Sequence, residues 1–95
     1  SPFAGKPGAA VVSARRGGTT ASLDVLNKYF TIASMPVVGS SYWNMVHGSK
    51  PEDVLEDKEG IQTMRNLGHN MAWMLKGLHA GFPAQEKGAR TNFIR

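Results

Sequence analysis

The stretch from Gly8 to Leu26 constrains the fold of this chain more than any other part of the sequence. It begins with seven small and β-branched residues, Gly8 to Ala14, passes through Arg15-Arg16-Gly17-Gly18 and runs into a helical pattern. The first seven residues lack polar alternation, which is typical of a parallel strand buried on both faces. The stretch therefore predicts a buried strand, a glycine-rich turn and a helix start, in that order.

The turn in this stretch is the first candidate for a ligand site. Glycine has no Cβ and tolerates positive φ, so the backbone of Gly17 and Gly18 can approach a ligand closely. The helix start that follows offers unpaired N–H groups and the positive end of a dipole. In an open α/β sheet, ligands bind at this edge. We therefore expect a ligand at the turn, and an anionic one is compatible with the local charge.

The residues after the turn predict a β-α-β unit. Thr19 or Thr20 can cap a helix in which apolar residues recur at three- and four-residue steps up to Ala33. Pro36 ends this helix, and the segment 36–40 predicts a second short strand. Two such strands joined by a helix should form a right-handed parallel crossover.

The second half of the chain predicts an irregular segment and two further helices. Residues 41–57 read as irregular, with a capping box at 49–52 that predicts a short helix over 50–56. Asp57 can cap a long helix that ends near Gly81 and Pro83. Gly68 and Gly77 inside this helix predict close packing against a neighbouring element, because each costs about 1 kcal/mol relative to alanine.

Composition excludes several classes of function. No apolar run approaches the length of about 20 residues that spans a bilayer, and no apolar signal core precedes Gly8, so we expect a cytoplasmic protein without a membrane partner. The chain has no cysteine, which excludes a disulfide framework, a thiolate metal site and a cysteine nucleophile within it. His47, His69 and His79 lack the spacing of metal ligands, and no catalytic residue is predicted.

The charges are unevenly spread along the chain. Residues 1–51 carry five Lys or Arg and one acid, whereas residues 52–95 carry six of each. Five scattered cations make a poor nucleic-acid footprint, so no nucleic-acid partner is expected. Five of the seven acids lie within 52–59, where they read as solvated helix starts, with paired catalytic carboxylates as the alternative.

A β-α-β-α pattern is too little for an independent α/β domain. Sheets of this type have about five strands, so two strands leave much of the sheet uncovered. We therefore expect either that the chain is the C-terminal part of a larger domain or that it completes its sheet with another chain.

Four segments resemble the NADPH-dependent FMN reductase family of flavodoxin-like proteins. Gly5–Thr20 is similar to the fourth strand and flavin-facing loop of that family, and Met35–Gly48 is similar to its fifth strand and the following loop. Gly68–Trp73 and Arg90–Arg95 resemble the last helix and the tail. The resemblance implies a flavodoxin-like three-layer α/β/α domain with a parallel sheet, to which residues 1–95 supply a C-terminal β-α-β-α portion.

The resemblance implies half of an FMN site. The family binds the FMN phosphate in a loop after its first strand and contacts the ring from a second loop, and this sequence contains neither. The third flavin-contacting loop corresponds here to Ser13, Ala14, Arg15, Arg16, Gly17, Gly18 and Thr19. Its N–H groups, with Arg15 or Arg16, would address the N1, O2 and N5 edge of the flavin, where donors stabilise the anionic reduced ring.

Two functions follow as hypotheses. The first is an FMN-binding NAD(P)H-dependent oxidoreductase, inactive as this chain alone, with NAD(P)H as co-substrate and the missing N-terminal half or a second copy as partner. In it, Tyr42, Trp43 and Asn44 stack on the flavin or wall it off, in the same chain or across a dimer; equally, Trp43 covers the end of the sheet. The second is a structural or interaction fragment that assembles through an exposed sheet edge without catalysis.

Overall fold

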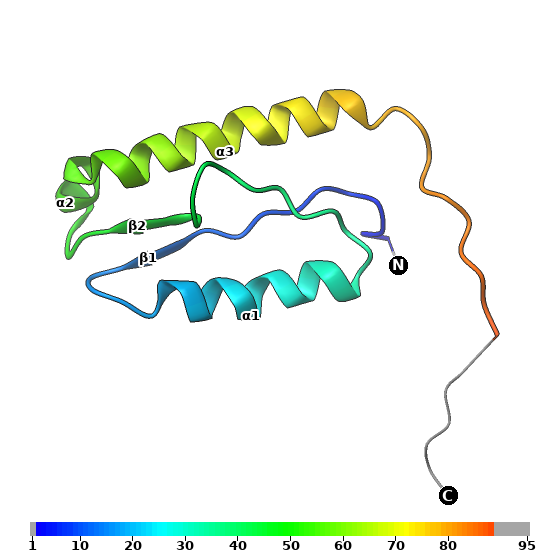
Figure 1. Cartoon of the computed structure of the whole chain (residues 1–95), viewed down its shortest axis with the longest axis horizontal. Coiled ribbons are helices and arrows are strands. Elements are labelled where there is room, and N and C mark those ends of the chain that lie inside the picture. Colours follow the sequence, from blue (N-terminus) through cyan, green and yellow to red (C-terminus); the bar gives the residue numbers. More distant parts are fainter. Residues whose placement is uncertain (1, 89–95) are drawn as a thin grey trace, which may run out of the picture.

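The chain folds into two short parallel strands flanked by helices. The computed structural model describes residues 2–88, and the elements follow in the order β1 (Val12–Ala14), α1 (Thr19–Ile32), β2 (Met45–His47), α2 (Pro51–Glu56) and α3 (Lys58–Gly77). The strands run between α1 and α3, with α1 alongside β1 and α3 alongside β2 (Figure 1). Val12 pairs with Met45 and Ala14 with His47 in parallel register. An α/β arrangement with a parallel sheet is therefore confirmed.

The second strand lies later in the chain than the sequence predicts. Regular pairing covers only the end of the predicted 8–14 strand, and the predicted 36–40 strand contributes a single bridge between Gly8 and Val37. The chain then leaves the ladder and rejoins it at Met45, inside the segment predicted to be irregular. The cause is Asn44, whose side-chain Nδ2 donates to the carbonyl of Ala10 at 3.0 Å, and whose own carbonyl accepts from the N–H of Val12 at 3.0 Å.

The N-cap of α1 and the C-terminus of α3 differ from their predictions. Gly18, in the left-handed region at φ 87°, caps α1 without a side-chain hydrogen bond, so Thr19 lies inside the helix and the predicted threonine cap is wrong. Asp57 caps α3 as predicted, because its Oδ1 accepts from the N–H of Gly60 at 2.9 Å. The same helix ends at Gly77 rather than near Gly81.

The short helix α2 has a different cap from the predicted one. Its N-cap is Lys50, and the carboxylate of Asp53 accepts from the N–H groups of Ser49 at 3.3 Å and Lys50 at 3.2 Å. The sequence motif assigns that role to Glu52, one residue earlier. The helix itself, at Pro51–Glu56, agrees with the prediction.

The close glycine contact on α3 is at Gly60, not at Gly68 or Gly77. A Cβ built on Gly60 would lie 2.9 Å from Cγ1 of Val46 and closer still to the Asp57 carboxylate, whereas a Cβ on Gly68 or Gly77 meets nothing within 4 Å. The prediction of close packing at the two later glycines is therefore wrong. Gly60 instead lets the first turn of α3 approach β2.

The buried core is small for a chain of this length. Only four hydrophobic residues of the described chain are buried, namely Ala10, Leu23, Val38 and Leu67. The accessible surface is 7573 Å², compared with about 5,400 Å² for a compact protein of the same mass. The radius of gyration is 17.0 Å, where about 12 Å is typical of a compact domain. Part of the excess belongs to the extended segment after Gly77, which is exposed throughout its described part.

The resemblance of Arg90–Arg95 to a family tail lies outside the described residues, so the structure does not bear on it. Within residues 2–88, no helix combines the length and the hydropathy that crossing a membrane requires.

Candidate functional site at the carboxyl edge of the sheet

The turn at Arg15–Gly18 lies at the carboxyl edge of the sheet and is exposed. It connects the end of β1 to the start of α1, and all four of its residues are solvent-accessible. A Cβ built on Gly17 or Gly18 meets nothing within 4 Å, so the space beside the turn is open. A ligand can therefore approach the backbone of the turn without displacing protein atoms.

The start of α1 presents donors without acceptors. The carbonyl of Gly18 accepts from both the N–H of Ser22, at 3.1 Å, and the Ser22 hydroxyl, at 2.9 Å. The N–H groups of Thr19, Thr20 and Ala21 have no acceptor within the described chain, and the first turn of α1 contains no acid. Unpaired N–H groups at a helix start favour an anionic or carbonyl-bearing group. Arg15 and Arg16 add positive charge at the same place.

Thr19 has a structural contact that the sequence does not reveal. Its side chain is buried, and its hydroxyl lies 3.1 Å from Sδ of Met45 on β2. The hydroxyl therefore faces the protein interior, and only the backbone of Thr19 remains directed to a ligand. This contact anchors the start of α1 to the sheet.

His47 and Asp57 lie at the same edge as the turn. His47 pairs with Ala14, and the N–H of Gly48 donates to the Ala14 carbonyl at 3.1 Å, so the segments that follow the two strands are adjacent. The Asp57 Oδ2 accepts from the backbone N–H of His47 at 2.8 Å and lies 3.8 Å from its Nδ1. Asp57 thereby joins the end of β2 to the start of α3.

The environment of Asp57 keeps its carboxyl group ionised. The hydrogen bond from the Gly60 N–H is the largest cause of its lowered pKa, followed by that from the His47 N–H. Burial opposes this shift, and the charge of His47 supports it. Within residues 2–88, no three histidines or acids gather as a metal site would require. The Asp57 carboxylate therefore caps α3 and links it to the end of β2.

Trp43 lies at the other end of the sheet. It precedes β2, whereas the Arg15–Gly18 turn follows β1, and the two strands are parallel. The Trp43 side chain is exposed, with the ring of Tyr42 tilted against it at a centroid distance of 6.2 Å. The structure therefore brings Ser13, Ala14 and the turn together but does not bring Trp43 to them within one chain.

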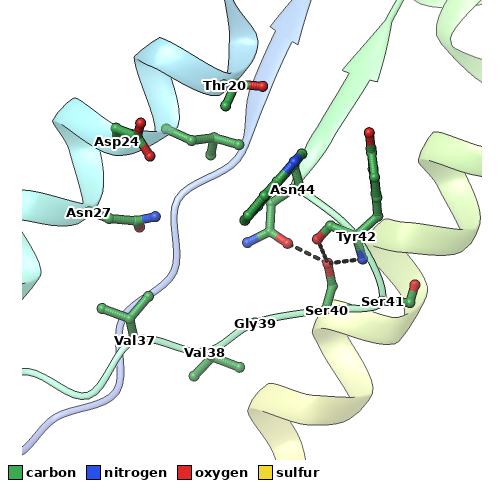
Figure 2. A pocket seen from close by; sticks show the side chains of 12 residues that line it. Thr20, Asp24, Asn27, Val37, Val38, Gly39, Ser40, Ser41, Tyr42 and Asn44 are labelled. Carbon is green, nitrogen blue, oxygen red and sulfur yellow. Dashed lines mark hydrogen bonds between the residues drawn. The ribbon is translucent and has the colours of Figure 1, made fainter.

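A separate open cavity of about 450 Å³ lies on the flank of α1 that faces the 37–44 segment. Figure 2 shows Thr20, Asp24 and Asn27 of α1 on one side and the 37–44 segment on the other. The Ser40 hydroxyl contacts both the Tyr42 carbonyl, at 2.8 Å, and Oδ1 of the buried Asn44. The sequence analysis groups Asn44 with Tyr42 and Trp43 as residues beside a flavin and misses its hydrogen bond to Ala10, because no local signal reveals a partner 34 residues away.

One comparison with known proteins gives a relative. The chain is 35% identical over 72 residues to an iron-sulfur flavoprotein of Methanocaldococcus jannaschii. The match covers 70% of this chain and 37% of that protein, so the chain spans little more than a third of its relative. No family model matches. No solved structure matches either. The similarity supports a relationship to flavoproteins, and it does not extend to the particular reductase family that the sequence motifs resemble.

Proposed function

We propose that this chain is the C-terminal β-α-β-α portion of a flavodoxin-like, cytoplasmic, FMN-binding NAD(P)H-dependent oxidoreductase. The observation that carries the proposal is the similarity to a flavoprotein in a chain that presents unpaired N–H groups beside two arginines. The flavin ring would lie against Ser13–Thr19, and the FMN phosphate would be held by polypeptide outside these 95 residues.

The residues at the turn fit a flavin ring. The space beside Gly17 and Gly18 is open, the first N–H groups of α1 lack acceptors in the part of the chain that the structure describes, and no acid in the turn competes for them. A bound FMN would supply a hydride acceptor for NAD(P)H, and the protein would contribute position and electrostatics. In this proposal the N–H groups and Arg15 or Arg16 would stabilise the negative charge of the reduced ring. The Thr19 hydroxyl does not take part, because it contacts Met45.

The iron-sulfur cluster in the relative's name does not transfer to this chain. Clusters of this kind are held by cysteine thiolates, and the chain has none. Thiolate ligands would therefore have to come from outside these residues. The proposal concerns the flavin alone.

The experiment that tests this function is a flavin titration followed by an assay of NAD(P)H oxidation. We expect the chain alone to bind FMN weakly and to lack reductase activity, whereas the flavoprotein that contains it binds FMN and oxidises NADPH or NADH. Arg15→Ala together with Arg16→Ala should weaken FMN binding about tenfold, equivalent to about 1.4 kcal/mol. Lys28→Ala, a charge change on the exposed side of α1, is the matched control. A colourless flavoprotein that ignores added FMN contradicts the proposal, as does tight FMN binding by the chain alone.

A second candidate, a non-catalytic interaction fragment, is favoured by the excess of exposed surface. Such a fragment would associate through its sheet edge without binding flavin. Light scattering with and without FMN distinguishes the two, because a stable monodisperse monomer contradicts forced assembly.

A further inference from the structure

Tyr42 and Trp43 are two large aromatic side chains that the proposed flavin site does not use. They lie at the end of the sheet opposite the Arg15–Gly18 turn, because they precede β2 whereas the turn follows β1. Each is 57% exposed, and the two rings are tilted against each other at an angle of 47°. Amphipathic rings of this kind are common where a protein meets a ligand.

Both rings line the cavity of about 450 Å³ between α1 and the 37–44 segment. Small-molecule sites have volumes of about 300–1,000 Å³, so this cavity is large enough for one. The buried side chains of Leu23 and Val38 also line it and, with the rings, make much of its surface apolar. The lining includes no residue of the Arg15–Gly18 turn, so the cavity is separate from the candidate flavin site.

The opposite wall of the cavity is a polar stripe on α1. Thr20, Asp24 and Asn27 follow one another at steps of four and three residues, which places them on one flank of the helix, and Figure 2 shows them on that wall. Within residues 2–88 none of these side chains has a hydrogen-bond or ion-pair partner. Lys28, one turn after Asp24, forms no ion pair with it. Asp24 is also the only charged residue in the lining.

The two walls together select a cation with an apolar body. An ammonium group carries three N–H donors, which suit the oxygen acceptors of Asp24, Asn27 and Thr20. A cation within about 6 Å of a Trp or Tyr ring is also attracted to the face of that ring. The carboxylate of Asp24 repels phosphate groups, so neither FMN nor NAD(P)H suits this cavity.

We propose that the cavity between α1 and the 37–44 segment binds a small arylalkylamine in its protonated form. The ammonium group would lie at Asp24, and the aromatic ring would lie against Tyr42 and Trp43. This site does not depend on the proposed flavin function, because it needs no flavin and shares no residue with Ser13–Thr19.

The test titrates the chain with three probes that share a phenyl ring on a short alkyl chain. At neutral pH phenethylamine is cationic, phenylethanol is neutral and phenylpropanoate is anionic. We expect phenethylamine to bind about tenfold more tightly than phenylethanol, and phenylpropanoate to bind more weakly still. Phenethylamine should also quench the fluorescence of Trp43 in a Trp73→Phe background, which leaves Trp43 as the remaining tryptophan.

Two variants test the two walls of the cavity. Asp24→Asn keeps the shape of the side chain and removes its charge, so phenethylamine should bind about tenfold more weakly. Trp43→Leu removes a ring and should weaken binding about threefold. Glu52→Gln, which removes a negative charge from the exposed surface of α2, is the matched control and should leave binding unchanged. Calorimetry measures the affinities, and helical circular dichroism checks the fold of each variant.

Binding that does not depend on the ammonium group would overturn the inference. Equal affinity for phenethylamine and phenylethanol, or equal affinity of Asp24→Asn and the unaltered chain, is such a result. Butylamine that binds as tightly as phenethylamine would remove the aromatic ring from the ligand class.

The flavoprotein that contains this chain provides the second measurement. Where a variant loses its helical circular dichroism, the same titration is made on that flavoprotein, and a lack of phenethylamine binding there also contradicts the site. Release of bound FMN by phenethylamine would show that the two sites are not separate. A flavoprotein that stays colourless with FMN but binds phenethylamine contradicts the proposed function and supports the amine site.

Discussion

The two sides of the sheet differ in how far their contacts are completed. On the β2 side, Asn44 bridges to Ala10, Thr19 contacts Met45, and Asp57 joins β2 to α3. On the β1 side, backbone groups have no partner among residues 2–88, and the apolar residues Val11 and Tyr29 are exposed. The same sequence thus specifies one side to the level of single hydrogen bonds and leaves the other without such contacts among residues 2–88.

The largest expected effect is on the completed side, at Gly60. Gly60→Ala forces a methyl group into contact with Val46 and the Asp57 carboxylate, and overpacking of this kind costs about 1–3 kcal/mol. Gly68→Ala is the matched control, because a methyl group there meets open space and should stabilise the helix by about 1 kcal/mol. Urea midpoints measure both changes. A Gly60→Ala variant as stable as Gly68→Ala would show that α3 does not approach β2 so closely.

The next largest effect is expected at Asn44. Asn44→Ala leaves the buried carbonyl of Ala10 without its side-chain donor and removes the contact with Ser40, and an unsatisfied buried group costs about 1–3 kcal/mol. Urea denaturation measures the loss. Ser41→Ala, which removes only an exposed hydrogen bond from Nδ2 of Asn66 at 2.9 Å, should have a smaller effect. Equal midpoints for both variants would mean that the bridge between the strands is not needed.

Low pH should reduce the stability of the contacts between β2 and α3, because it protonates Asp57. The folded state holds the pKa of this carboxyl below its ordinary value of 3.8, chiefly through the N–H of Gly60. Because the folded pKa is lowered, the stabilisation is fully present above pH 3.8 and is lost as the pH falls below 3.8 through the folded pKa. Denaturation midpoints from about pH 6 to pH 2.5 measure this change. The denaturation midpoint of the Asp57→Asn variant should depend less on pH in the acid range than that of the unaltered chain. An unchanged pH dependence would assign the effect to other acids.

The smallest effect on stability is expected on the open side. Tyr29→Ser removes an exposed ring from the chain alone, so its urea midpoint should change by less than about 0.5 kcal/mol. A loss as large as that of Asn44→Ala would mean that the ring already packs within the chain. The comparison of the two sides would then no longer hold.

Local chemistry explains which parts of the fold are predictable. Asp57 was identifiable as a cap because its partner lies three residues away, and α1 follows from its regular apolar spacing. The position of β2 was not, because it depends on Asn44 reaching Ala10, 34 residues away. Threonine is a common N-cap residue, yet the N-cap of α1 is Gly18, which adopts a positive φ. The hydroxyl of Thr19 instead contacts Met45.

The candidate site likewise has one feature that the sequence predicts and others that depend on the strand pairing. The position of Arg15–Gly18 at the carboxyl edge follows from the order of strand, turn and helix. The separation of Trp43 from that turn could not be predicted, because it depends on where pairing resumes after Val37. The adjacency of the turn to Gly48 and His47 likewise requires the parallel register.

The outer edge of β2 limits how the chain can assemble. Met45 donates its backbone N–H to the Trp43 carbonyl at 2.7 Å, and His47 donates to Asp57 at 2.8 Å. With these donors occupied and the ladder interrupted before Met45, that edge is a poor template for another strand. A sheet that can be extended at one edge only stops growing once that edge is filled. If a strand were to pair at β1, the result would therefore be a closed complex rather than a filament, because β2 offers no second edge for growth.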